Sequence, residues 1–195
     1  MFDIIVMKEI KYFVQSLKKE DRLKNIQKNK SIIPEMEIFE SINGYDINTT
    51  IENLKNMKLN YKHLDFPTYG TLANFLTKVK AFKYQIKNKI KYICLIEDDL
   101  ILKKGFRKFI ESNLHLSDNC NMLRLDNWGE GYVTSLHGAK QIVKYIYTTG
   151  IIHNIDNQLR LFCGKEVKLN KTPWKLVSVT NQGDCLKTES ISPSM

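Results

Sequence analysis

The sequence lacks most of the features that identify secreted, membrane-spanning or zinc-stabilised proteins. Its 195 residues include only four cysteines, and none stands at the paired spacing of a zinc module, so a structural zinc site is excluded. No apolar run approaches the length of a membrane span, and the apolar patch at the N-terminus is too short for a signal peptide. There is also no internal repeat and no low-complexity tract. These absences predict a cytoplasmic protein with a single globular domain over residues 1–195.

Charge is abundant, but it is not clustered. The formal net charge of +9 predicts attraction to anions, whether nucleic acid, an acidic membrane surface or a phosphorylated substrate. Lysines occur in every segment, and there are neither clustered arginines nor basic residues interleaved with aromatic ones, so no nucleic-acid partner is expected. Peripheral contact with an acidic membrane surface stays open as an expectation.

The most informative feature is a run of three carboxylates, Glu97, Asp98 and Asp99, directly after the apolar stretch 92–96. Adjacent anions at the end of a buried strand repel each other and lose solvation unless they share a cation. Oxygen ligands favour Mg²⁺ or Mn²⁺ over zinc, and these ions usually bridge to phosphate oxygens. The run predicts a metal-diphosphate site at the carboxyl end of a parallel strand, where ligands of open α/β sheets bind. The alternative is a solvated turn after the strand.

Hydrophobic periodicity predicts alternating strands and helices along the chain. Strands are expected at 10–17, 36–42, 91–96, 121–125 and 131–135, with weaker ones at 166–169 and 175–180. Helices are expected at 18–30, from Asp46 or Asn48 to 57, and at 71–86, 104–114, 137–147 and 156–162. Residues 182–195 have little apolar content and are expected to form a lid or a loose tail.

Three polar residues share one face of the helix that precedes the acidic strand, namely Thr71, Asn74 and Lys78. The N-terminus of a helix with a lysine nearby suits a phosphate group. A solvated helix face is the equally weighted alternative. In the acidic run itself, strand alternation places Glu97 and Asp99 on one side and Asp98 on the other, for as long as strand geometry continues.

A series of segments along the chain resembles, in its order, one enzyme family. The segments are Phe-Val-Gln-Ser-Leu-Lys-Lys-Glu-Asp-Arg at 13–22, Phe-Glu-Ser-Ile-Asn-Gly-Tyr-Asp at 39–46, 70–78, Glu-Asp-Asp at 97–99, 131–135 with Gly138-Ala139, and Asp156. Together they resemble the nucleotide-sugar glycosyltransferases of the lipopolysaccharide-biosynthesis and procollagen-galactosyltransferase group, glycosyltransferase family 25. That family usually has a Ser-His pair where Thr77-Lys78 stands in this chain.

The resemblance implies a fold and an activity. The fold is a single-domain GT-A architecture of the α/β class, Rossmann-like, with a mixed and mostly parallel sheet flanked by helices. The activity is metal-dependent transfer of a sugar from a nucleotide-diphosphate donor, expected to be a UDP-sugar, to a saccharide or glycoprotein acceptor with inversion. The cofactor is expected to be Mn²⁺ or Mg²⁺, held by a DXD-like motif.

The resemblance also implies roles for particular residues at the donor site. Asp99 is expected to be the main metal ligand and Asp98 the next, while Glu97 is expected to bind ribose or sugar hydroxyls or to coordinate through water. Ser16 and Arg22 are expected to contact the nucleotide near the end of the first strand. For Arg22, a surface ion pair with Glu20 or Asp21 is the alternative.

Inversion at the anomeric carbon requires a carboxylate that takes the proton of the acceptor hydroxyl. The first candidate for this base is Asp156, and Asp126 and Glu130 are the other candidates. Each of the three has a competing role as a helix cap or a turn acid.

Two other classes of function stay open from the sequence. In a metal-dependent nuclease or nucleotidyltransferase, the acids would hold two metal ions and the lysines would bind the nucleic-acid backbone. The sequence disfavours this class because it has no second acidic motif after a strand. A non-catalytic binding module with the same fold is the third hypothesis.

Overall fold

The structure is a computed structural model that describes residues 10–61, 68–118, 122–125, 131–163, 165–167 and 177–180. Its strands are β1 (Ile10–Ser16), β2 (Glu37–Glu40), β3 (Tyr92–Glu97), β4 (Met122–Arg124), β5 (Gly131–Ser135), β6 (Lys165–Val167) and β7 (Val177–Thr180). They form one seven-stranded mixed sheet in the order β2-β1-β3-β5-β4-β7-β6. Strand β1 pairs in parallel with β2 and β3, and every pairing from β3 to β6 is antiparallel.

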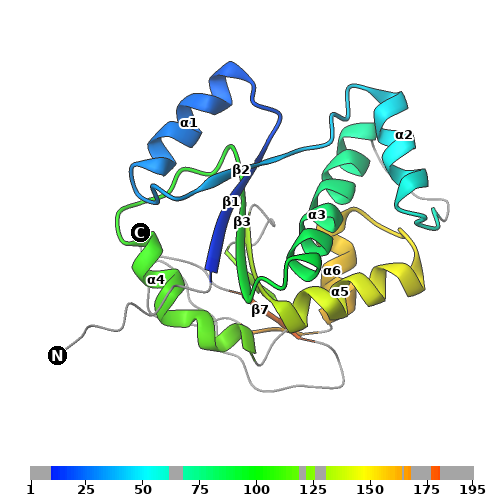
Figure 1. The fold of residues 1–195 in the computed structure, drawn as a ribbon. Coiled ribbons are helices and arrows are strands. Elements are labelled where there is room, and N and C mark those ends of the chain that lie inside the picture. Colours follow the sequence, from blue (N-terminus) through cyan, green and yellow to red (C-terminus); the bar gives the residue numbers. More distant parts are fainter. Residues whose placement is uncertain are drawn as a thin grey trace.

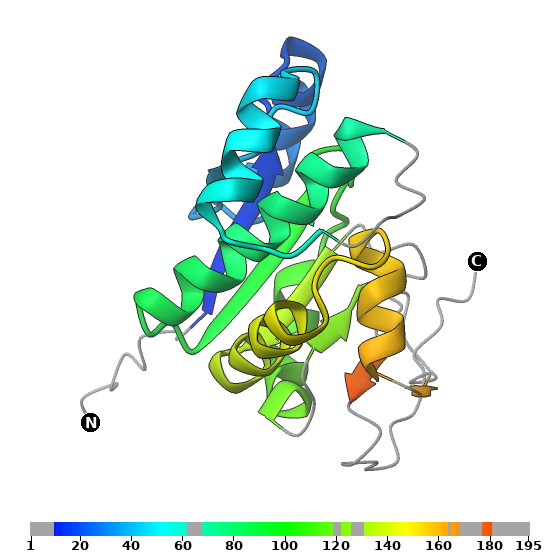
Figure 2. The same cartoon turned by 90° about the vertical axis from the view of Figure 1, so that its right-hand side faces the viewer.

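Helices cover both faces of this sheet. They are α1 (Glu20–Lys30), α2 (Ile47–Asn56), α3 (Tyr69–Lys87), α4 (Phe106–Asn113), α5 (Leu136–Thr149) and α6 (Ile155–Cys163), with a 3₁₀ turn at Leu114–Asp118. Helices α1 and α4 lie on one face, and α3, α5 and α6 lie on the other (Figure 1). Helix α2 packs on the outside of α3. Helices α5 and α6 lie side by side and also contact α3 (Figure 2).

Strand β3 lies at the junction of the parallel and antiparallel parts, and its side chains alternate between the two faces. Cys94 and Ile96 pack into the cluster that includes α1 and α4, whereas Ile93 and Leu95 pack towards α3. The same alternation turns Glu97, the last residue of the strand, towards α3. The central strand therefore carries its terminal carboxylate to the α3 side of the sheet.

Side-chain caps start three of the helices. Asp46 at the start of α2, Thr68 at the start of α3 and Ser135 at the start of α5 each accept a hydrogen bond from the backbone N–H three residues later. Such a cap typically contributes about 1 kcal/mol because it satisfies a backbone donor that the helix leaves unpaired. Helix α5 ends at Gly150, whose φ of +76° is in the region that favours glycine.

The α/β class, with a mixed sheet flanked by helices, is confirmed. Each strand and helix boundary lies within two residues of its prediction, and Asp46 is the cap of α2. The expected lid or tail at 182–195 lies outside the described residues. In the described part of the chain, no helix has the length and apolar content needed to cross a bilayer.

Candidate active site

A pocket of about 590 Å³ lies where the parallel strands β1, β2 and β3 end. Gln15 and Ser16 line it from the end of β1, Ile42 from the segment after β2, and Glu97 and Asp98 from the end of β3. In open α/β sheets this is the crevice in which ligands bind, because the loops that follow parallel strands converge there. The acidic run predicted to form a ligand site therefore reaches a pocket of ligand size.

Ser16 fixes the position of the Asp98 carboxylate at the pocket. Its hydroxyl donates to Asp98 Oδ2 at 2.6 Å and accepts from the backbone N–H of Lys18 at 2.9 Å. Lys18 has a φ of +59°, so the chain turns sharply directly after β1. The turn and the hydrogen bond together present the Asp98 carboxylate towards the pocket.

Arg22 supplies a positive charge to the same acids. Its Nε lies 3.9 Å from Asp98 Oδ1, and its NH1 lies 3.5 Å from Asp99 Oδ2. Arg22 also lies 3.6 Å from Asp21, so the surface pair expected as an alternative is present as well. These contacts are long, and the Arg22 side chain is 36% exposed, so its charge is only loosely held.

The acidic run leaves strand geometry directly after Glu97. Asp98 and Asp99 form a turn, so the expectation that Glu97 and Asp99 share one side is wrong. Glu97 and Asp98 line the pocket, whereas Asp99 is half exposed beside Arg22. The buried Asn29 holds this turn, since its side chain donates to the carbonyl of Leu100 at 2.7 Å and accepts from Leu102 N–H at 2.8 Å. A lone Asn in a polar helix gave no sign of this role.

The mouth of the pocket is aromatic and apolar. Tyr45, Ile47 and Tyr69 line it and are all exposed, Tyr45 by 80%. The ammonium of Lys19 lies 4.2 Å from the centre of the Tyr45 ring. Sequence reasoning missed these residues, although the Asn43-Gly44 turn signal directly before Tyr45 marked the segment.

Two glycines allow the loop after β2 to meet the start of α3. A Cβ atom on Gly44 would lie 2.5 Å from Gly70 Cα, a distance that backbone atoms do not tolerate. A Cβ atom on Gly70, in contrast, would meet only the Thr68 hydroxyl oxygen, at 3.4 Å. Gly44 is therefore required for the close approach that shapes this wall of the pocket.

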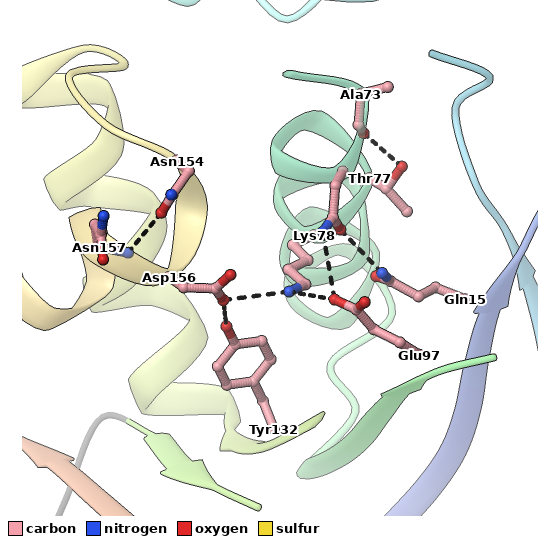
Figure 3. Close-up of polar contacts among 10 residues, drawn as sticks. Gln15, Ala73, Thr77, Lys78, Glu97, Tyr132, Asn154, Asp156 and Asn157 are labelled. Carbon is pink, nitrogen blue, oxygen red and sulfur yellow. Dashed lines mark hydrogen bonds and ion pairs between the residues drawn. The ribbon is translucent and has the colours of Figure 1, made fainter. Parts of the chain in front are cut away.

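A buried cation, the ammonium of Lys78, lies between the carboxylates of Glu97 and Asp156 (Figure 3). Lys78 of α3 is 1% exposed, and its ammonium lies 2.8 Å from Glu97 Oε1 and 3.4 Å from Asp156 Oδ1. The hydroxyl of Tyr132 donates a short hydrogen bond to the same Asp156 oxygen. Asn74 also donates to Glu97 Oε1, at 3.3 Å, so the network extends to the pocket.

The protonation of this network follows from burial and charge. Burial disfavours the charged form of Lys78, but the negative charges of Glu97 and Asp156 outweigh it and raise the pKa above its ordinary value of 10.5. Burial also raises the pKa of Tyr132, so its phenol keeps its proton and acts as a donor to Asp156. At neutral pH the network contains a charged ammonium and a neutral phenol.

The chain also matches a model of a known family. Residues 9–130 match glycosyltransferase family 25 (LPS biosynthesis protein). The chain belongs to this family. Membership makes the protein a glycosyltransferase, which moves a sugar from a donor to a saccharide acceptor. No curated protein matches the chain.

The match ends before β5, so two members of the buried network, Tyr132 and Asp156, lie beyond it. Where the family 25 resemblance expects a Ser-His pair, Thr77 and Lys78 are both buried. Thr77 accepts a hydrogen bond from Ile42 N–H at 2.9 Å, and thus ties the segment after β2 to α3. Lys78 makes the ion pairs described above.

The predicted site residues of this glycosyltransferase fall into three groups. Those that line the pocket are Ser16, Arg22, Asn74, Glu97 and Asp98. Those that contact a pocket-lining residue without lining the pocket are Thr71, Lys78 and Asp99, whereas Asp156 is connected to the pocket only through Lys78 among the contacts of the described residues. Asp126 and Glu130 lie outside the described residues. The solvated helix face considered for Thr71, Asn74 and Lys78 is wrong for Lys78, because tertiary contacts bury it.

The acidic turn fits a divalent cation that a ligand helps to coordinate. In the part of the chain that the structure describes, no group of three or more His, Cys, Asp or Glu side chains can hold a metal ion. Mg²⁺ and similar ions need no such cage, because one or two carboxylates suffice when phosphate oxygens and water complete the coordination. Asp98 and Asp99 already share one cation, the guanidinium of Arg22.

Proposed function

We propose that this glycosyltransferase uses a nucleotide-diphosphate sugar, with UDP as the nucleotide, and depends on Mn²⁺ or Mg²⁺. The reaction inverts the anomeric centre, and the acceptor is a saccharide or a glycoprotein. One observation carries this proposal: charged residues and exposed aromatic residues line the same pocket. Arg22 and Asp98 are among the charged residues, and Tyr45 and Tyr69 are the exposed aromatic ones.

The charged and aromatic residues that line the pocket match the parts of a nucleotide sugar. A nucleobase has a flat apolar face, which an exposed tyrosine ring can stack against. The diphosphate needs cations and hydrogen-bond donors, which Arg22 and the acid-bound metal ion supply. Asn74 and Glu97 also line the pocket and offer an amide and a carboxylate to ribose or sugar hydroxyls.

Asp98 and Asp99 would hold the metal ion, which when bound neutralises charge on the diphosphate leaving group. Ser16 keeps the Asp98 carboxylate in place by its hydrogen bond. Arg22 has a long, loose contact with each acid, so its guanidinium is free to turn towards a phosphate oxygen. The chain therefore offers two sources of positive charge at the place where the leaving group gains negative charge.

The acceptor hydroxyl oxygen forms the new bond to the anomeric carbon. The bond from that carbon to the β-phosphate oxygen breaks, and its electron pair leaves with the nucleoside diphosphate. The hydroxyl proton passes to a carboxylate, for which Asp156 is our first candidate and Asp126 and Glu130 are the others. Both contacts that the Asp156 side chain makes with described residues use Oδ1, so we assign the proton to Oδ2.

A thermal-shift screen tests the proposal directly. UDP-, GDP- and TDP-sugars are added with and without Mn²⁺, and Asp98→Asn serves as the matched control. A ligand that binds only the folded protein stabilises it by about 2.7 kcal/mol at 100 times its Kd. We expect a Mn²⁺-dependent shift with UDP-sugars that is lost in the Asn variant. The proposal is overturned if no nucleotide sugar shifts the melting temperature, or if the variant shifts as much as the wild type.

A further inference from the structure

The buried ammonium of Lys78 joins two elements on the same face of the sheet, the end of β3 and the first turn of α6. Glu97 ends β3 and lines the donor pocket, whereas Asp156 is in the first turn of α6. Lys78 contacts both carboxylates from its place on α3, and its Nζ also lies 4.8 Å from the centre of the Tyr132 ring. Figure 3 shows the ammonium between the two acids, with the tyrosine ring alongside.

Lys78 is badly placed to bind substrate. It does not line the pocket, and its side chain is 1% exposed, so a phosphate group cannot reach it without rearrangement of the wall. Its partners among the described residues include two carboxylate oxygens, Glu97 Oε1 and Asp156 Oδ1. The contacts leave the second oxygen of each carboxylate without a hydrogen-bond partner among the described residues.

The charges explain why the ammonium is needed. Two carboxylates brought close together at the edge of a protein core repel each other, and a buried cation between them compensates both. Gln158 ties α6 to the loop before it, since its side chain donates to the Gly150 carbonyl at 2.7 Å and accepts from Ile152 N–H at 2.9 Å. The backbone of α6 therefore has its own attachment, and Lys78 acts on the direction of the Asp156 side chain.

We propose that Lys78 is a positioning residue that holds Asp156 at a fixed distance from the donor pocket by bridging it to Glu97. The proposal rests on the proposed function, with Asp156 as the base. Lys78 and Tyr132 occupy Oδ1, which leaves Oδ2 to take the proton of the acceptor hydroxyl. Lys78 exchanges no proton itself, and the bonds that form and break are those of the transfer step above.

A double-mutant cycle on Lys78→Met and Asp156→Asn tests this role. The rate measured is release of UDP from UDP-galactose, or from the UDP-sugar that the thermal-shift screen identifies, in Mn²⁺. Because a general base contributes about 100-fold or more, we expect each single variant to lose about 100-fold in kcat. We expect the double variant to lose no more than about threefold beyond the worse single variant, since both changes disable one unit.

Two further measurements separate positioning from general damage. The Kd of UDP, measured by calorimetry in Mn²⁺, is expected to change less than about threefold in Lys78→Met, because the loss falls on the chemical step. Lys80→Met, an exposed lysine two residues along the same helix, is the matched control and is expected to keep its kcat within about twofold. If Lys78→Met does not fold, Lys78→Gln replaces it in the cycle, because its amide keeps N–H donors. The kcat of Lys78→Gln is expected to fall at least about tenfold.

The outcomes distinguish the two proposals. A wild-type protein that turns over no nucleotide sugar overturns the proposed function, and this inference with it. If the wild type is active and Lys78→Met or Lys78→Gln keeps full kcat, only the role of Lys78 is overturned, and the proposed function stands. The same conclusion follows if the losses from Lys78 and Asp156 multiply, to about 10,000-fold in the double variant.

Discussion

Two of the basic residues at the site differ in burial and in the distance to their carboxylate partners. Arg22 is 36% exposed and lies 3.5 to 3.9 Å from Asp99 and Asp98, whereas Lys78 is 1% exposed and lies 2.8 Å from Glu97. A partly exposed ion pair with long contact distances costs little free energy to break. A buried pair that loses its cation leaves an uncompensated charge in the interior. We conclude that the Arg22 contacts are exchangeable, as ligand binding requires, and that the Lys78 contacts are permanent.

The two cations also belong to different parts of the sheet. Arg22 serves the parallel part, where the ends of β1, β2 and β3 converge on the pocket. Lys78 links that part to Tyr132 and Asp156, which come from the antiparallel strand β5 and from α6. The family match covers the first part and stops before the second. In our proposal, donor binding and proton removal depend on different regions, and Lys78 contacts an acid from each.

The largest expected effect is on stability, at the buried cation. Lys78→Met leaves Glu97 and Asp156 without their shared partner, so we expect the free energy of unfolding to fall by about 3 kcal/mol. Urea unfolding measures this loss. Adding Asp156→Asn should return part of it, because one of the two uncompensated carboxylates is then removed. If Lys78→Met is as stable as the wild type, the buried Lys78 does not stabilise the fold more than Arg22 does, and our comparison is contradicted.

The next largest effect concerns donor affinity at the acidic turn. Asp98→Asn keeps the size of the side chain but removes a metal-binding charge, so we expect the Kd of UDP in Mn²⁺ to rise about 100-fold. Asp99→Asn is expected to act in the same direction. Calorimetry measures both, and circular dichroism checks that the fold is kept. Undiminished affinity in both variants would place the metal ion elsewhere.

The matched pair of glycines tests the shape of the pocket wall. A methyl group at Gly44 would clash with the backbone at Gly70, so Gly44→Ala is expected to cost about 2 kcal/mol and to weaken UDP binding. Gly70→Ala meets only ordinary contacts within α3, so it should be neutral or slightly stabilising, by about 0.5 kcal/mol. Equal effects from the two variants, measured by thermal unfolding, would contradict this account of the wall.

The smallest expected change in stability is at the exposed cation. Arg22→Met should alter the free energy of unfolding by less than about 1 kcal/mol, because the pairs it breaks are exposed and long. The same variant should raise the Kd of UDP about tenfold, since it removes a cation that faces the diphosphate. Measured side by side, Arg22→Met should therefore change mainly the Kd of UDP, and Lys78→Met mainly the free energy of unfolding. A large loss of stability in Arg22→Met would contradict this difference between the two cations.

Much of the fold was predictable because hydrophobic periodicity depends on local sequence. The apolar run 92–96 forms a buried strand, and the periodic segment from Thr71 forms α3. The acidic run was placed at the correct end of that strand for the same reason. Five of the residues proposed for the donor site line one pocket, which follows from the convergence of parallel strands.

The parts that could not be predicted depend on contacts between distant segments. Lys78 shares a helix stripe with Asn74, and nothing in its local spacing shows that α6, 78 residues later, brings Asp156 within 3.4 Å. Strand parity misplaced Asp99 because Asn29, on another helix, holds the chain in a turn after Glu97. The contact between Gly44 and Gly70 is equally invisible to local pattern. Tertiary packing decided all three positions.

The central claim is that the acidic turn holds a diphosphate through a divalent cation. The most direct test is a calorimetric titration of UDP and of UMP into the wild-type protein, each with Mn²⁺ and with EDTA. We predict that UDP binds in Mn²⁺ at least about tenfold more tightly than UMP, because UMP lacks the β-phosphate, and that EDTA removes this advantage. Equal binding of UDP and UMP, or UDP binding that EDTA leaves unchanged, would contradict the account.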